Sequence, residues 1–154
     1  MLTRISTTLL QGLVVLLGIA VLVFLLWEPH LEGVNANATT LWEIYFDDPF
    51  LAYAYLGSIP FFVGAYQAFA LLGLLGEGRA FSAASAQALR TLKRCALLTA
   101  GLILGAAVFL VATHDGQEDI AGAISLTFLL TVTSLGVAGA AALLERKARK
   151  ALGR

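Results

Sequence analysis

The chain has little charge and almost no cysteine. Only 13% of its 154 residues are Asp, Glu, Lys or Arg, whereas about a quarter of residues are charged in an ordinary soluble domain. Its single cysteine, Cys95, excludes an internal disulfide and a cysteine-based zinc site. What is present is mostly apolar, at 59% of residues. The composition excludes a typical soluble protein, and the length favours a single domain.

Four long stretches contain no charged residue, and they determine the fold class. They are Ile5–Trp27, Pro49–Gly76, Cys95–Thr113 and Ile120–Leu144, with 23, 28, 19 and 25 residues. A helix needs about 20 apolar residues to cross the hydrocarbon layer of a bilayer. We therefore predict an all-α integral membrane four-helix bundle, with one transmembrane domain over residues 1–154. The predicted helices cover residues 6–27, 50–75, 82–113 and 120–145, and the predicted outer loops cover residues 28–49 and 114–119.

The first charge-free run is expected to remain as a membrane anchor. The apolar core of a cleaved signal peptide is about 7–15 residues long, and Ile5–Trp27 is longer. The small residues Ala36 and Ala38 resemble a cleavage motif, but they lie too far beyond the run to serve it.

Basic residues occupy only alternate connections between the runs. All ten Lys and Arg lie before the first run, between the second and third, or after the fourth. Eight of the ten acidic residues lie in the other two connections. Because Lys and Arg are retained on the cytoplasmic side, we predict an up-down-up-down protein of the bacterial inner membrane with both termini inside. Residues 82–94 would form a cytoplasmic extension of the third helix.

The basic residues of the middle segment and the tail are the main candidate site. They are Arg79, Arg90, Lys93, Arg94, Arg146, Lys147, Arg149 and Lys150. Apolar Ala86, Leu89 and Leu92 recur at three-residue spacing. Arg90, Lys93 and Arg94 are predicted to lie on the other side of the helix. Such a face would bind anionic headgroups, each cation contributing about 1 kcal/mol. A generic positive-inside anchor and a docking face for a cytoplasmic partner are the alternatives.

Polar side chains are rare within the predicted spans. Gln67 is the deepest amide, and we expect it to make an interhelical hydrogen bond. Gln11 lies in the first turns of its helix, where it would reach the headgroups. A second hypothesis is a small oligomeric transporter or channel subunit, in which Tyr66, Gln67 and a kink at Pro60 line the path.

Small residues recur in the third and fourth runs. Small side chains four residues apart allow helix backbones to approach closely in lipid. We expect Gly101, Gly105, Gly136 and Ala140 to pack helices together within the bundle, with self-association into a homo-oligomer as the alternative.

The sequence lacks the residue sets of common chemistries. No Asp, Glu, Lys, Arg or His lies inside the four charge-free runs that cross the membrane, which argues against a proton-coupled pump. No nucleotide-binding, zinc-protease or hydrolase motif is present. We predict a non-enzymatic protein without cofactor, metal or direct nucleic-acid binding. His30 and His114 lie near outer-loop carboxylates and could hold a divalent cation. Acidic outer loops also arise because basic residues are kept inside, and we assign no metal site.

One outer segment is rich in aromatic residues. The spacing of large apolar side chains over Leu41–Phe46 predicts a short stretch that lies along the outer membrane interface.

The middle of the chain, residues 60–96, resembles a bacterial family known as domain of unknown function 2975. The resemblance rests on Pro60-Phe61, Tyr66-Gln67-Ala68, Leu71-Leu72, Ala80-Phe81-Ser82, Ala88-Leu89-Arg90, Lys93 and Cys95-Ala96. Members are small membrane proteins with four predicted helices and no established activity, so no catalytic residue is carried over. They are often encoded beside a helix-turn-helix regulator, which implies a cytoplasmic transcriptional regulator as a partner.

Overall fold

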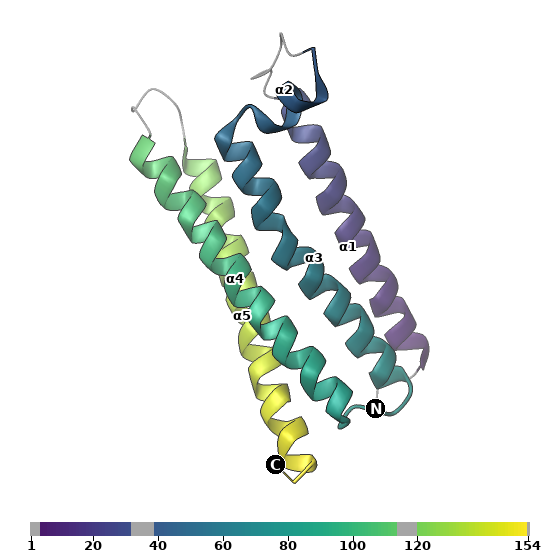
Figure 1. Ribbon diagram of the computed structural model, residues 1–154. Helices are drawn as coiled ribbons and strands as arrows, with labels where there is room; N and C mark the ends of the chain where they lie inside the picture. The colour runs from purple at the N-terminus through teal and green to yellow at the C-terminus, as the bar shows by residue number, and fades with distance from the viewer. Residues whose placement is uncertain (1–3, 32–38, 114–119, 154) are drawn as a thin grey trace.

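The structure, a computed structural model, describes residues 4–31, 39–113 and 120–153, and all the regular secondary structure in these ranges is helical. The helices are α1 (Arg4–Leu31), α2 (Leu41–Phe46), α3 (Pro49–Gly76), α4 (Ala83–Thr113) and α5 (Ala121–Ala151) (Figure 1). Four of them are long and apolar enough to cross a membrane. The predicted fold class, an all-α four-helix membrane bundle, is confirmed.

The four long helices follow one another in space in the order in which they occur in the chain. α1 packs on α3, α3 on α4, and α4 most extensively on α5. Within the described ranges, α1 and α5 make no extended contact, and they lie on opposite sides of the molecule (Figure 1). Successive long helices run antiparallel, so both ends of the chain lie at the same end of the bundle (Figure 1). We name this the basic end, and the opposite end, where α2 lies, the acidic end.

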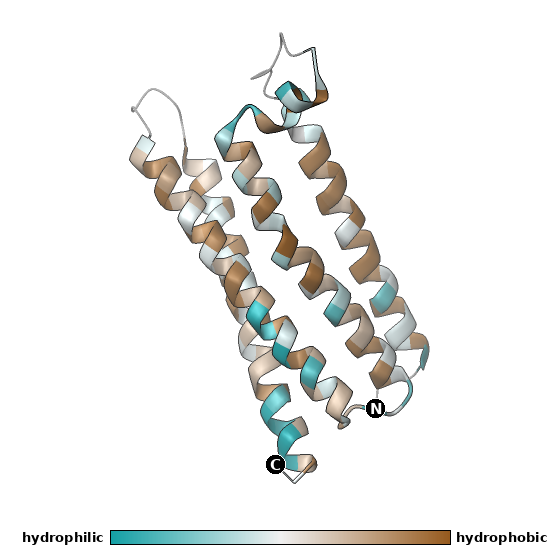
Figure 2. Ribbon diagram, viewed as in Figure 1, coloured by the Kyte–Doolittle hydropathy of each residue, from teal (hydrophilic) through white to brown (hydrophobic). Residues whose placement is uncertain are grey.

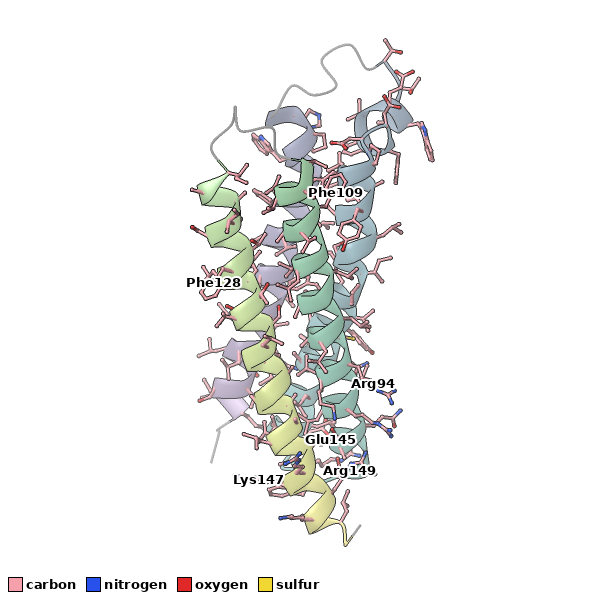
Figure 3. All side chains as sticks on the ribbon, turned by 90° about the vertical axis from the view of Figure 1, so that its left-hand side faces the viewer. Arg94, Phe109, Phe128, Glu145, Lys147 and Arg149 are labelled. Atoms are coloured by element: carbon pink, nitrogen blue, oxygen red, sulfur yellow. The ribbon has the colours of Figure 1, made fainter. Side chains whose placement is uncertain are left out.

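The outward surfaces of the spans are apolar. Phe128 of α5 has 71% of its surface exposed and points away from the other helices (Figure 3). Apolar residues dominate the length of all four helices, whereas hydrophilic residues gather on α4 and α5 near the basic end (Figure 2). Since lipid covers such surfaces in a membrane protein, their exposure is the expected arrangement.

The helices α4 and α5 extend past their charge-free runs at the basic end. α4 begins at Ala83, 12 residues before Cys95, and α5 continues to Ala151, seven residues after Leu144. At a rise of 1.5 Å per residue, these extensions are about 18 Å and about 10 Å long. We name this pair of extensions, residues 83–94 and 145–151, the stem. The fourth helix was predicted to end at residue 145, and the structure extends it because its basic tail packs on α4.

The helix α1 also continues further than the sequence predicts, since Pro29 does not stop it. Proline cannot donate a hydrogen bond to the carbonyl four residues earlier, which is that of Leu25. In the structure, Tyr55 of α3 donates its hydroxyl to this carbonyl oxygen over 2.9 Å. The helix therefore passes through Pro29 to Leu31, with the missing hydrogen bond replaced by one from a neighbouring helix.

A tight turn joins α3 to α4. Gly78 has a φ of 76°, a conformation that glycine adopts without steric cost. The amide of Arg79 donates to the Leu74 carbonyl at 2.8 Å, which completes the usual pattern of a glycine-terminated helix. The Ser82 hydroxyl then accepts a hydrogen bond from the Ser85 amide at 3.1 Å, so Ser82 caps the N-terminus of α4. This turn fixes the position of α4 against α3.

Candidate functional site at the basic end

The contact between α4 and α5, in the stem and in the spans next to it, is built on a repeating pattern. On α4 the pattern is Ala86, Leu89, Lys93, Ala96 and Ala100, and on α5 it is Ala138, Ala141, Glu145 and Ala148. Both series alternate steps of three and four residues, the spacing of helices that pack along a seam. The apolar members are all buried. Each helix therefore places one charged residue in an otherwise apolar seam.

The two charged residues of the seam bind one another. The Lys93 Nζ atom donates to Glu145 Oε2 over 2.6 Å. Glu145 Oε1 accepts from Arg149 on the next turn of α5, at 3.0 Å from Nε and 2.8 Å from Nη2. Both carboxylate oxygens are thus occupied, and only 6% of the residue is exposed. Because the carboxylate is paired and hydrogen-bonded, its burial is compensated.

Glu145 follows the charge-free run that ends at Leu144, so it lies on the stem. The hydrogen bond from Lys93 lowers the pKa of the Glu145 carboxyl, and the charges of Lys93 and Arg149 add to this effect, whereas burial opposes it. The carboxylate is therefore ionised at neutral pH, and its negative charge holds two of the basic residues.

Three of the eight predicted basic-face residues are paired with acidic groups. Lys93 and Arg149 bind Glu145, and Arg79 lies 3.3 Å from Glu77. The structure also places Lys93 differently from the prediction. It lies in the seam with Leu89, not on the opposite side with its neighbours, because its helical position between Leu89 and Ala96 points it at α5.

The other five basic-face residues are exposed and have no acidic partner within the described part of the chain. They are Arg90, Arg94, Arg146, Lys147 and Lys150. Arg94 projects from the side of α4 away from α5, while Lys147, two residues from Glu145, leaves α5 on the face away from the seam (Figure 3). Positive charge therefore surrounds the stem on both helices.

The free cations lie at two levels along the stem. Arg94 and Arg146 are within two residues of the charge-free runs, where headgroups begin. Arg90 and Lys150 are five and six residues beyond them, or about 8–9 Å further along the helices. One level can contact lipid, and the other projects past it.

The polar residues predicted inside the membrane take different positions from those expected. Tyr66 is 68% exposed, on the outside of the single chain. Gln67 is half-buried, and its side chain makes no hydrogen bond within the described ranges. The interhelical hydrogen bond from a side-chain amide is made by Gln11 instead. Its Nε2 atom donates to the Phe69 carbonyl oxygen over 3.0 Å. Gln11 was expected to reach headgroups, but α3 lies close enough for one of its carbonyl groups to accept a hydrogen bond from the Gln11 amide.

The predicted packing residues are only partly at helix contacts. A Cβ on Gly105 would lie 2.8 Å from the Tyr53 hydroxyl, so Gly105 lies against α3. Positions 101 and 136 have nothing within 4 Å of such an atom, and Ala140 is exposed. Gly64 of α3 is a further contact position, because a Cβ added there would lie 3.3 Å from the Cβ of Cys95 on α4.

The possible cation ligands of the outer loops lie mostly outside the described residues. This applies to Glu32, His114 and the carboxylates of residues 115–119. His30 is exposed, with its ring 6.3 Å from that of Tyr45. No group of three His, Cys, Asp or Glu side chains is placed to hold a metal within the ranges that the structure describes.

The four apolar helices and the basic stem define an integral membrane protein, and comparison with known proteins places it within one family. The family model described as "Protein of unknown function (DUF2975)" matches residues 32–153, and the chain belongs to this family. It is also similar to an uncharacterised membrane protein, YoaS, of Bacillus subtilis (strain 168). The two are 31% identical over 150 residues, which cover 97% of this chain and 92% of the relative. No solved structure matches the chain.

Proposed function

We propose that this protein is a non-enzymatic component of the bacterial inner membrane that signals through its basic stem. The observation that carries the proposal is a set of five exposed cations, unpaired among the residues that the structure describes, on a stem whose two helices are joined through Glu145. A stem joined in this way keeps its charges in fixed positions, and fixed charges support a docking role better than a flexible basic tail does.

The two levels of charge support two kinds of contact. Arg94 and Arg146, next to the ends of the spans, fit the anionic headgroups of the cytoplasmic leaflet. Arg90 and Lys150 project further and fit an acidic surface on a cytoplasmic protein. A helix-turn-helix regulator, implied by the family resemblance, is the partner that we propose for this further level. Lipid binding then anchors the stem, and the projecting charges carry the signal.

The proposal is tested by capturing partners from cells that express the intact membrane protein. The variant carries Arg90→Glu and Lys150→Glu, which reverse the projecting charges and leave the Glu145 pairs intact. We expect it to lose the captured regulator while inserting into the membrane normally. A matched control with Arg90→Lys and Lys150→Arg keeps the charge and should keep the partner. If charge reversal leaves every captured protein unchanged, the stem is not a docking site.

A further inference from the structure

We propose that α2 is a docking surface for the lipid–water interface of the membrane at the acidic end. This proposal is independent of the function proposed for the stem, because it concerns the opposite end of the bundle and different residues. The partner is the bilayer itself, at the level where the headgroups meet the acyl chains.

The outer surface of α2 is apolar and exposed. Leu41, Trp42 and Phe46 are 75%, 68% and 47% exposed. The rings of Trp42 and Phe46 are stacked, with centroids 4.8 Å apart, so they present one continuous apolar surface. Three large exposed apolar side chains on a helix of six residues mark an interaction site.

Glu43 is the single charged residue of α2, and its carboxylate caps the N-terminus of this helix. Glu43 Oε2 accepts hydrogen bonds from the amides of Thr39 and Thr40 at 2.8 Å and 3.2 Å. The Thr40 hydroxyl accepts from the Glu43 amide at 3.2 Å. This reciprocal capping fixes the first turn of the helix. It also draws the carboxylate to the N-terminus, so that the apolar surface carries no charge of its own.

The C-terminal end of α2 is attached to the spans through aromatic rings. Tyr45 lies 6.3 Å from the His30 ring of α1 and 6.2 Å from the Tyr55 ring of α3. Phe46 lies 5.9 Å from Tyr55. α2 therefore rests across the ends of α1 and α3 (Figure 1). These contacts cover part of Tyr45 and Phe46, while Leu41, Trp42 and the remainder of Phe46 stay exposed.

The position of α2 identifies its partner as the membrane interface. The chain leaves one charge-free run at Trp27 and enters the next at Pro49, and α2 lies between these two points. Trp27 and Pro49 mark the edge of the hydrocarbon layer on this side. Tryptophan is enriched at this membrane–water interface in membrane proteins. An interfacial helix buries its apolar face about 5–10 Å into the boundary between headgroups and acyl chains.

The segment that carries the α2 surface differs from the basic stem in the sign of its charge. Residues 28–49 contain no Lys or Arg, but they contain five acidic residues. Attraction to anionic lipid therefore cannot hold α2, and burial of apolar surface must. Docking of α2 should accordingly be insensitive to salt and to the headgroup charge, unlike lipid contact at the stem.

The chain offers a direct test, because Trp27 and Trp42 are its two tryptophans. The Trp27→Phe variant is reconstituted into zwitterionic vesicles whose lipids carry bromine high on the acyl chains. We expect blue-shifted emission from Trp42, strong quenching by the brominated lipid and weak quenching by aqueous iodide. High salt or added anionic lipid should change none of these. The Trp42→Phe variant reports Trp27 at the end of its span and serves as the control for reconstitution.

Two results would overturn the proposal. Strong quenching of Trp42 by iodide, with none by brominated lipid, would place α2 in water. Protection from both quenchers would mean that protein, such as a second copy of the chain, covers the surface. Neither result would bear on the stem, whose test uses Arg90 and Lys150.

Discussion

Lys93 Nζ lies 2.6 Å from Glu145 Oε2, in the middle of a seam that is otherwise alanine and leucine. Alanine seams are flat and repetitive, so one helix could slide against the other with little change in contact. A charged pair at one position resists this, because a shift by one turn would separate Lys93 from Glu145 and leave the buried carboxylate with Arg149 alone. The pair therefore sets the register of the stem.

Removal of Glu145 should destabilise the protein. Glu145→Leu fills the seam but leaves Lys93 and Arg149 without their acceptor. Since these two side chains are 30% and 47% exposed, they can turn to water. We therefore expect a loss of only about 1–2 kcal/mol in the free energy of unfolding. Reversible unfolding in mixed micelles measures it.

The matched double variant separates pairing from packing. Lys93→Leu with Glu145→Leu makes the seam apolar throughout and leaves no buried charge, so it should recover much of the lost stability. The single variants Lys93→Leu and Glu145→Leu each lose some free energy of unfolding. If the loss in the double variant equals the sum of these two losses, the pair contributes no coupling energy.

Gly64 is a position where a side chain is poorly tolerated between α3 and α4. A Cβ there would already lie 3.3 Å from the Cβ of Cys95, close to the backbone of α4. We expect Gly64→Leu to destabilise by about 1–3 kcal/mol, because the helices must separate to admit it. Gly136→Leu is the control, since nothing lies within 4 Å of its added Cβ. Equal losses in thermal unfolding at both positions would contradict the packing described.

The features that were predictable from sequence are those that depend on local pattern. Four uninterrupted apolar runs are enough to define the spans, because a bilayer has a fixed thickness. The cap at Ser82 and the turn at Gly78 follow from residues adjacent in the chain. The aromatic spacing of Leu41–Phe46 likewise marked a distinct segment, which forms α2.

What could not be predicted depends on which helices meet and in what register. Lys93 and Glu145 are 52 residues apart. The sequence around either residue does not indicate that the other is its partner. Gln11 finds its acceptor at Phe69 on α3, where its local sequence suggested only the headgroups. The alternating three- and four-residue steps through Lys93 and Glu145 were a usable signal, but it needs both helices to be compared together.

Acid should loosen α2 through Glu43. Hydrogen bonds from the amides of Thr39 and Thr40 lower the pKa of this carboxyl below its ordinary value of 4.5. With the pKa lowered in the folded state, the stabilising contribution is present above 4.5 and is lost as the pH falls through the lower folded-state value. Emission from Trp42 in the Trp27→Phe background should therefore shift to the red in that acidic range. Glu43→Gln keeps an acceptor without a titrating group, so its emission should not change with pH there.

The sidedness of the protein is tested by labelling cysteines in intact cells. Cys95, the one native cysteine, is buried, so it should contribute little background. Gln87→Cys, exposed on the stem, should react with a membrane-impermeant maleimide only after the cells are opened, because the positive-inside rule places the basic end in the cytoplasm. Thr40→Ser with Thr39→Cys places a thiol beside α2 and keeps a capping hydroxyl, and this thiol should react in intact cells. Labelling of position 87 before the cells are opened would invert the topology and remove the basis for cytoplasmic docking by the stem, while α2 would still lie at the opposite membrane interface.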